Sequence, residues 1–150
     1  MINFEIIHNG KNSIRSYEKD RNVYECFAKT DHEEKPICVC KISATENKWT
    51  ISSWYTKSEY KNRGIGKQTL GYLLHYLYET YGIPETIEYI WDGTNEYVYN
   101  WMTKHFDAKC MCPLAVLKMN EAADDWLAHV YELNVEKVVQ YFEMQQIKVM

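Results

Sequence analysis

The sequence contains only three prolines and six glycines in 150 residues, and no run of either residue divides the chain. It also lacks internal repeats and low-complexity segments. Linkers between domains are usually rich in proline, glycine and polar residues, so their absence gives no sign of a domain boundary. A chain of this length can form one hydrophobic core. We therefore expect a single domain over residues 1–150.

Long apolar stretches are also missing. No run approaches the roughly 20 apolar residues that a membrane-spanning helix needs. The first residues, MINFEIIHNGKNS, lack the basic and then apolar pattern of a secretory signal. The sequence thus predicts a cytoplasmic protein without membrane association.

Positive charge is not in excess, since the formal net charge is −4. Proteins that bind nucleic acid or anionic membranes without specificity carry a basic surplus. We expect no nucleic-acid partner. Against this acidic background, a local group of cationic residues is more informative than it would be in a basic protein.

The five cysteines lack the C-x₂₋₄-C spacing of structural zinc sites. Cys38 and Cys40, like Cys110 and Cys112, are two residues apart within apparent strands, so each pair shares one face of its strand. We expect small, reduced core residues without a metal and without disulfides.

Segments rich in β-forming residues alternate with polar turns in the first part of the chain. Strands are expected over residues 2–8, 23–30, 37–44 and 49–56, the last three as an antiparallel meander. From Ile65 the apolar residues follow helical spacing, and Gly82 and Pro84 end this helix at about Tyr81.

The second part begins with an expected strand over residues 86–92, parallel to an earlier strand because a helix lies between them. A helix from Thr94 or Asn95 to about His105 follows. Two further strands, over residues 108–119 and 129–134, and a helix from Val135 complete the expected elements. The fold class predicted from this order is α+β.

The segment EYKNRGIGKQTL, residues 59–70, places cationic side chains and two glycines where the first helix begins. Glycines allow a ligand to approach the backbone closely, and the N–H groups of a first helical turn have no partner within the helix. The pattern is typical of a site for a multiply charged anion. A solvated loop before a helix is the simpler alternative.

Two known phosphate loops do not fit this segment. Lys61 stands where a Walker A loop has its first glycine, and Gln68 follows Lys67 where that loop needs Ser or Thr. In a dinucleotide fingerprint, Thr69 would replace the third glycine. Both are excluded.

The run Tyr60-Lys61-Asn62-Arg63-Gly64-Ile65-Gly66 resembles the acetyl-CoA loop of the GCN5-related N-acetyltransferases, the GNAT superfamily. That loop, Gln/Arg-x-x-Gly-x-Gly/Ala, lies between the fourth strand and the next helix, and Tyr-Arg-Gly-Lys-Gly-Ile-Gly is a common form of it. The order of expected elements is similar to that family over most of the chain. The resemblance implies a mixed, mainly antiparallel sheet with splayed fourth and fifth strands, flanked by helices.

The resemblance also implies where acetyl-CoA binds. The pantetheine arm would contact the fourth strand, the diphosphate would lie on the loop, and an asparagine after the fifth strand would contact the arm or cap a helix. The implied contacts are Trp54, Tyr55, Thr56, Lys61, Asn62, Arg63, Gly64, Ile65, Gly66, Lys67 and Asn95.

The residues that would transfer protons depart from the family's pattern. Family members often use a glutamate on the fourth strand as base, but residues 49–56 contain no carboxylate. Ser52 and Ser53 can at best order a water molecule. Other candidates for the base are distant in sequence: Glu88, Asp92 and His75.

The family's general acid is usually a tyrosine seven residues after the asparagine, where this sequence has Met102. Tyr97 and Tyr99 both remain candidates, and Tyr99 is favoured because it lies one turn before Met102.

We thus expect a CoA-dependent N-acyltransferase that moves an acetyl group to an unidentified amine, on a small molecule or a protein. With about a dozen residues between its first two strands, the acceptor pocket is expected to be open or completed by the C-terminal segment or a second subunit of a homodimer. The alternative is a non-catalytic acyl-CoA-binding or protein-interaction module. An enzyme acting on aminoacyl-tRNA is disfavoured by the acidic composition.

Overall fold

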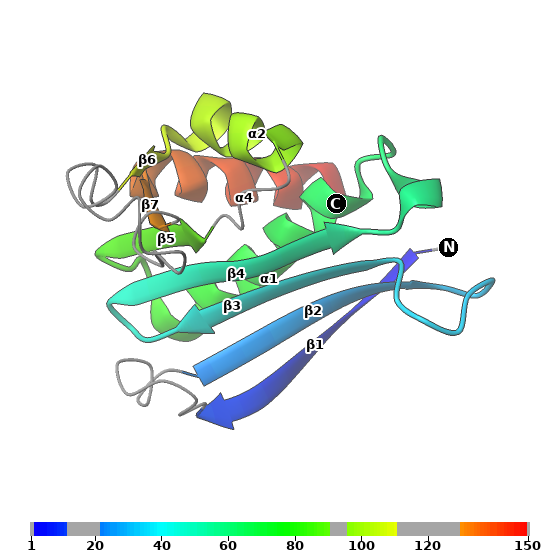
Figure 1. Ribbon diagram of the computed structural model, residues 1–150. Coiled ribbons are helices and arrows are strands. Elements are labelled where there is room, and N and C mark those ends of the chain that lie inside the picture. The colour runs from blue at the N-terminus through cyan, green and yellow to red at the C-terminus, as the bar shows by residue number, and fades with distance from the viewer. Residues whose placement is uncertain (1, 12–21, 91–95, 111–129, 150) are drawn as a thin grey trace, which may run out of the picture.

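The computed structural model describes residues 2–11, 22–90, 96–110 and 130–149 (Figure 1). The chain forms, in order, β1 (Ile2–Lys11), β2 (Asn22–Thr30), β3 (Cys38–Ala44), β4 (Lys48–Thr56), a short 3₁₀ helix (Ser58–Tyr60), α1 (Ile65–Tyr81), β5 (Thr86–Ile90), α2 (Glu96–Phe106), β6 (Lys109–Cys110), β7 (Val130–Leu133) and α4 (Val135–Val149).

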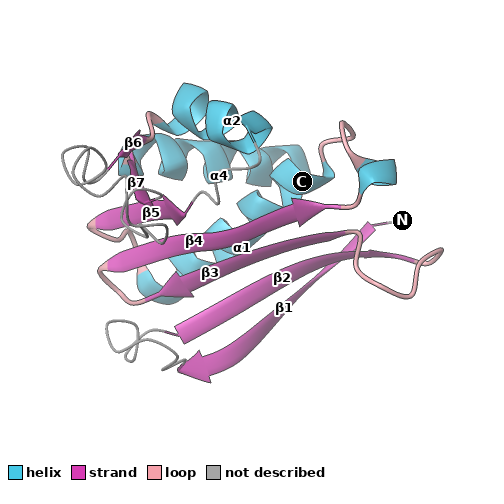
Figure 2. Ribbon diagram, in the orientation of Figure 1, coloured by secondary structure: helices cyan, strands magenta, loops and turns pink. Residues whose placement is uncertain are grey.

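The described strands form one sheet in the order β1-β2-β3-β4-β5-β7-β6. The pairing of β4 with β5 is parallel, and the other pairings are antiparallel. Helix α1 provides the crossover that a parallel pair requires. The expected fold class, a mixed α+β sheet flanked by helices, is confirmed (Figure 2).

The main core lies between one face of this sheet and the helices. Alternate residues of the strands, such as Ile42, Trp49 and Ile87, are fully buried against Leu73 and Leu77 of α1. Helices α2 and α4 contribute to the same core through a further set of buried side chains: Val98, Trp101, Met102, Phe106, Val138 and Phe142. Apolar side chains that recur every second residue in the strands and about every 3.6 residues in the helices thus form one shared apolar layer.

The last residues of β4 extend beyond its pairing with β5. Lys41 of β3 pairs with Ser53, whereas the next residue, Ile42, pairs with Ile51, so Ser52 forms a β-bulge. Within the described residues the β4–β5 ladder ends at Ile51 and Tyr89, although β4 continues to Thr56. Bulges bend and twist a strand. The expected splay between the fourth and fifth strands is confirmed here.

The boundaries of α1 agree with those expected, while β1 extends three residues beyond the expected His8. The start of α2 lies one residue beyond Asn95. Asn95 and Asp92 lie outside the described residues, as do residues 111–129, so that most of the expected strand over residues 108–119 cannot be placed.

Three cysteines, Cys26, Cys38 and Cys40, are buried and free. Burial, and to a lesser extent the nearby Cys38, raises the pKa of the Cys26 thiol to about 12. Burial likewise raises the pKa of Cys38 and Cys40. Within the described residues no cluster of potential metal ligands occurs. The reduced, metal-free state remains a prediction.

The described helices include none with the length and apolar character needed to cross a membrane.

Candidate functional site

The first N–H groups of helix α1 have no hydrogen-bond acceptor within the helix. Gly64 is its N-cap residue, with φ 79°, and the first helical bond runs from the Gln68 N–H to the Gly64 carbonyl at 3.0 Å. The N–H groups of residues 65–67 therefore precede the ladder. The N-cap residue, Gly64, has no side chain that could cap them. This arrangement favours an anion at the helix start.

The loop before α1 needs two residues with positive φ. Gly64 adopts φ 79° without a steric penalty because it has no side chain. Asn62 adopts φ 66°, and asparagine is among the few other residue types that accept this region readily. The family's common form has a glycine at the position of Asn62. Asn62 therefore replaces that glycine with a residue type that also accepts positive φ.

The four cations of this region have different surroundings. Lys57 is paired with the carboxylates of Glu33 at 3.0 Å and Glu59 at 3.5 Å, and the hydrogen bond to Glu33 raises the pKa of Lys57. The guanidinium of Arg63 lies over the Tyr60 ring, 5.3 Å from its centroid.

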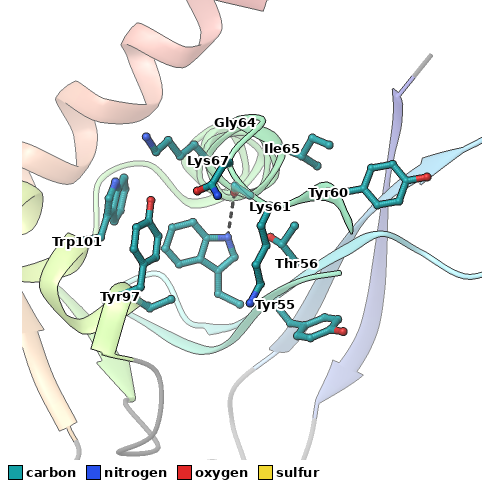
Figure 3. Close-up of a pocket in the computed structure, with 13 residues that line it drawn as sticks. Tyr55, Thr56, Tyr60, Lys61, Gly64, Ile65, Lys67, Tyr97 and Trp101 are labelled. Atoms are coloured by element: carbon teal, nitrogen blue, oxygen red, sulfur yellow. Dashed lines mark hydrogen bonds between the residues drawn. The ribbon is translucent and has the colours of Figure 1, made fainter. Parts of the chain in front are cut away.

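The other two cations, Lys61 and Lys67, line a cavity of about 430 Å³. This volume lies within the range of about 300–1,000 Å³ found for ligand pockets. The lining comes from the end of β4, the loop, the start of α1 and α2: Trp54, Tyr55, Thr56, Tyr60, Lys61, Asn62, Gly64, Ile65, Gly66, Lys67, Tyr97, Val98 and Trp101. Tyr97 and Trp101 stand on one side of it, Thr56 and Tyr60 on the other (Figure 3).

The cavity brings together nine of the cofactor contacts that the sequence implies. Of the other two, Arg63 does not belong to the lining, and Asn95 lies outside the described residues. The lining also includes Tyr60, Tyr97, Val98 and Trp101, which were not assigned to the cofactor from the sequence. Val98 and Trp101 have helical spacing and are buried, but this pattern does not reveal that their face borders a cavity.

Close packing fixes the start of α1 against β4. The indole Nε1 of Trp54 donates a hydrogen bond to the Gly66 carbonyl at 2.9 Å, drawn as a dashed line in Figure 3. A Cβ at Gly66 would lie 2.9 Å from Thr56 Oγ1 and 3.5 Å from Trp54 Nε1. Glycine at this position therefore allows the helix to approach the strand closely.

The candidate bases lie elsewhere. Glu88 is 4% exposed, its carboxylate accepts the Thr50 hydroxyl at 3.2 Å, and it pairs with the Lys48 ammonium at 2.8 Å. His75 Nδ1 lies 3.2 Å from the Glu79 carboxylate on the outer part of α1. Within the described part of the chain, the residues that line the cavity include neither a carboxylate nor an imidazole.

The two candidate acids occupy different positions on α2. Tyr97 lines the cavity and is 63% exposed. Tyr99 is not among the lining residues, and its ring packs edge-on against Tyr131 with centroids 5.3 Å apart. Residues two apart on a helix point in nearly opposite directions, so the geometry separates these candidates.

One protein family matches the sequence of this chain. The sequence profile of the Acetyltransferase (GNAT) family matches residues 4–113. Among proteins of curated function, none matches the chain.

Three solved structures illustrate the similarity in fold. The N-acetyltransferase PaiA from Thermoplasma acidophilum, in complex with coenzyme A, is 16% identical with a TM-score of 0.56, covering 81% of this chain and 65% of that one. Tetrahymena GCN5 is 9% identical, TM-score 0.53, covering 75% and 68%. An aminoglycoside acetyltransferase from an uncultured soil metagenomic sample, in complex with trehalose, is 12% identical, TM-score 0.50, covering 69% and 86%.

Proposed function

Because the chain belongs to the acetyltransferase (GNAT) family, we propose that it binds acetyl-CoA in the cavity at the start of α1 and transfers the acetyl group to an amine. One observation carries this proposal. The N–H groups of residues 65–67 precede the first hydrogen bond of α1, and they lie at a cavity that Lys61 and Lys67 line. These donors and charges suit a diphosphate. The end of β4 beyond the β4–β5 ladder offers backbone groups to an amide-bearing arm.

The proposed reaction forms a C–N bond and breaks the thioester C–S bond. The attacking amine loses a proton, and the departing thiolate of CoA gains one. The acceptor is an amine of unknown identity; PaiA and the aminoglycoside acetyltransferase share the fold, and the second is named for an amine-bearing substrate class. Acetyl is the acyl group that the family description favours.

The proposal is tested by calorimetric titration of the protein with CoA and acetyl-CoA, followed by release of free thiol with a panel of amines. Heat of binding together with turnover is expected. Binding without turnover on any amine would favour the non-catalytic acyl-CoA-binding module. No binding at millimolar CoA would overturn the proposed function.

Lys61→Ala is expected to weaken CoA binding roughly five- to twentyfold, because hydrogen bonds to charged groups contribute about 1.5–3 kcal/mol and the exposed position lowers this contribution. Lys57→Ala serves as the matched control. It removes a cation from the same region, but one already paired with Glu33 and Glu59, and should leave the affinity within about twofold. Equal effects of the two variants would contradict a specific role for Lys61.

For the proton that the thiolate gains, we propose a tyrosine of α2, and the position of Tyr97 in the cavity lining supports Tyr97 over Tyr99. Tyr97→Phe is expected to lower kcat at least tenfold, since general acids contribute about 10²–10⁴. Tyr99→Phe is the matched change on the same helix and should lower kcat less than threefold. The reverse result in steady-state assays would restore Tyr99 as the acid.

A further inference from the structure

The C-terminal helix α4 lies beyond the residues that the family profile matches, which end at residue 113. It is nevertheless built into the fold. Val138 and Phe142 are fully buried in the main core. The Asn134 side chain accepts the N–H of Lys137 at 3.0 Å, which caps the first turn of α4. The helix is therefore held firmly enough to transmit a constraint to its neighbours.

One side chain of α4 reaches the start of α1. The Tyr141 hydroxyl donates a hydrogen bond to the Lys67 carbonyl at 2.6 Å. Lys67 belongs to the turn whose N–H groups open on the cavity, and its own side chain lines that cavity. Burial raises the pKa of Tyr141 well above its ordinary value, so the phenol stays protonated and remains a donor.

Two successive carbonyls of this turn are thus held by aromatic donors from different elements. Trp54 of β4 holds the Gly66 carbonyl at 2.9 Å, and Tyr141 of α4 holds the Lys67 carbonyl. Both donors also touch Trp101 of α2, with ring centroids 5.1 Å and 5.4 Å from it. The buried Trp101 Nε1 has no hydrogen-bond partner among the described residues, and ring packing sets the position of this side chain.

We propose that α4 is part of the cofactor site and that Tyr141 is its positioning residue, fixing the first turn of α1 against the wall of the cavity formed by Trp101. The inference rests on the proposed function for the identity of the ligand, CoA. The backbone donors of residues 65–67 belong to one rigid turn, so a tilt of that turn misdirects all of them together. A bond to the turn from α4 therefore pre-organises the site before the ligand arrives.

Tyr141→Phe tests this inference, because it removes the hydroxyl and keeps the ring that packs on Trp101 and Phe106. In the ligand-free protein, amide hydrogen exchange in the peptide covering residues 68–75, whose N–H groups are the first of α1 with partners in the helix, should become roughly three- to tenfold faster. The Kd for CoA should rise by a similar factor. In steady state, KM for acetyl-CoA should rise while kcat and the KM of the amine stay unchanged.

The matched control is Tyr72→Phe, the same change on α1 at a 45% exposed residue whose ring stacks on Phe4 rather than on the cavity. It should alter neither exchange nor affinity. A general loss of stability would instead lower kcat by reducing the folded fraction and would speed exchange throughout the chain. That pattern would contradict a positioning role for Tyr141.

The outcomes separate this inference from the proposed function. Unchanged exchange at residues 68–75 in Tyr141→Phe overturns the inference, whether or not CoA binds. If exchange is faster in Tyr141→Phe but the unchanged protein does not bind CoA, the positioning of the first turn of α1 by α4 is supported and the proposed function is overturned.

Discussion

Gly66→Ala is expected to lower CoA affinity about tenfold, and Gly66→Val to abolish detectable binding. The added Cβ would lie 2.9 Å from Thr56 Oγ1, closer than van der Waals contact permits, and 3.5 Å from Trp54 Nε1. The start of α1 must then move away from β4 and carry the backbone donors of residues 65–67 with it. Overpacking of this kind costs about 1–3 kcal/mol, and 1.4 kcal/mol corresponds to a tenfold change in affinity.

A second substitution makes the steric cause testable. Thr56→Ala removes the Oγ1 atom that the new Cβ would meet, so the double variant Gly66→Ala/Thr56→Ala should bind CoA more tightly than Gly66→Ala alone. Calorimetry on the four proteins of this cycle gives the interaction energy between the two positions. Additive effects would show that the contact with Thr56 is not the reason that glycine is needed.

Gly82→Ala controls for the general cost of removing a glycine. Gly82 has the same φ of 79° as Gly64, with ψ −161°, and nothing lies within 4 Å of a Cβ built there. This conformation is nearly restricted to glycine, so alanine should destabilise the fold by about 1–3 kcal/mol. Because Gly82 ends α1 at the far side from the cavity, CoA affinity should not change. A thermal melt and a titration on the same sample measure both.

Acetyl transfer is expected to accelerate about tenfold per pH unit up to the pKa of the acceptor amine. Among the residues that the structure describes, those lining the cavity include no carboxylate or imidazole, and both oxygens of Glu88 already have partners. We therefore expect the amine to arrive neutral or to lose its proton through water. For an amine with a lysine-like pKa of about 10.4, kcat/KM should rise about 100-fold between roughly pH 6.5 and pH 8.5.

The matched comparison uses two acceptor amines that differ in pKa. If no protein base takes part, the rising limb of kcat/KM shifts with the pKa of the amine, because only the neutral fraction reacts. A limb that stays at one pH for both amines, or a profile flat above about pH 6.5, would reveal a protein base. Glu88→Gln, Asp92→Asn and His75→Gln would then identify which of the three candidates supplies it.

Local patterns in the sequence were sufficient to predict α1 and the loop before it. The apolar spacing from Ile65 and the stop at Gly82 gave both helix boundaries, because a helix and its ends depend on residues close together in the chain. The positions that need positive φ, Asn62 and Gly64, are likewise occupied by residue types that signal such a backbone. The crossover helix predicted that β5 is parallel to an earlier strand, and that strand is β4.

Tertiary structure decided which of these residues form the cavity. Whether a cation remains available depends on distant partners: Lys57 is paired with Glu33, 24 residues earlier. The contact of Tyr141 with Lys67 joins residues 74 positions apart. The bulge at Ser52 and the end of the β4–β5 ladder arise from pairing between strands. Such contacts depend on how whole elements pack, and no pattern within one segment of the sequence specifies them.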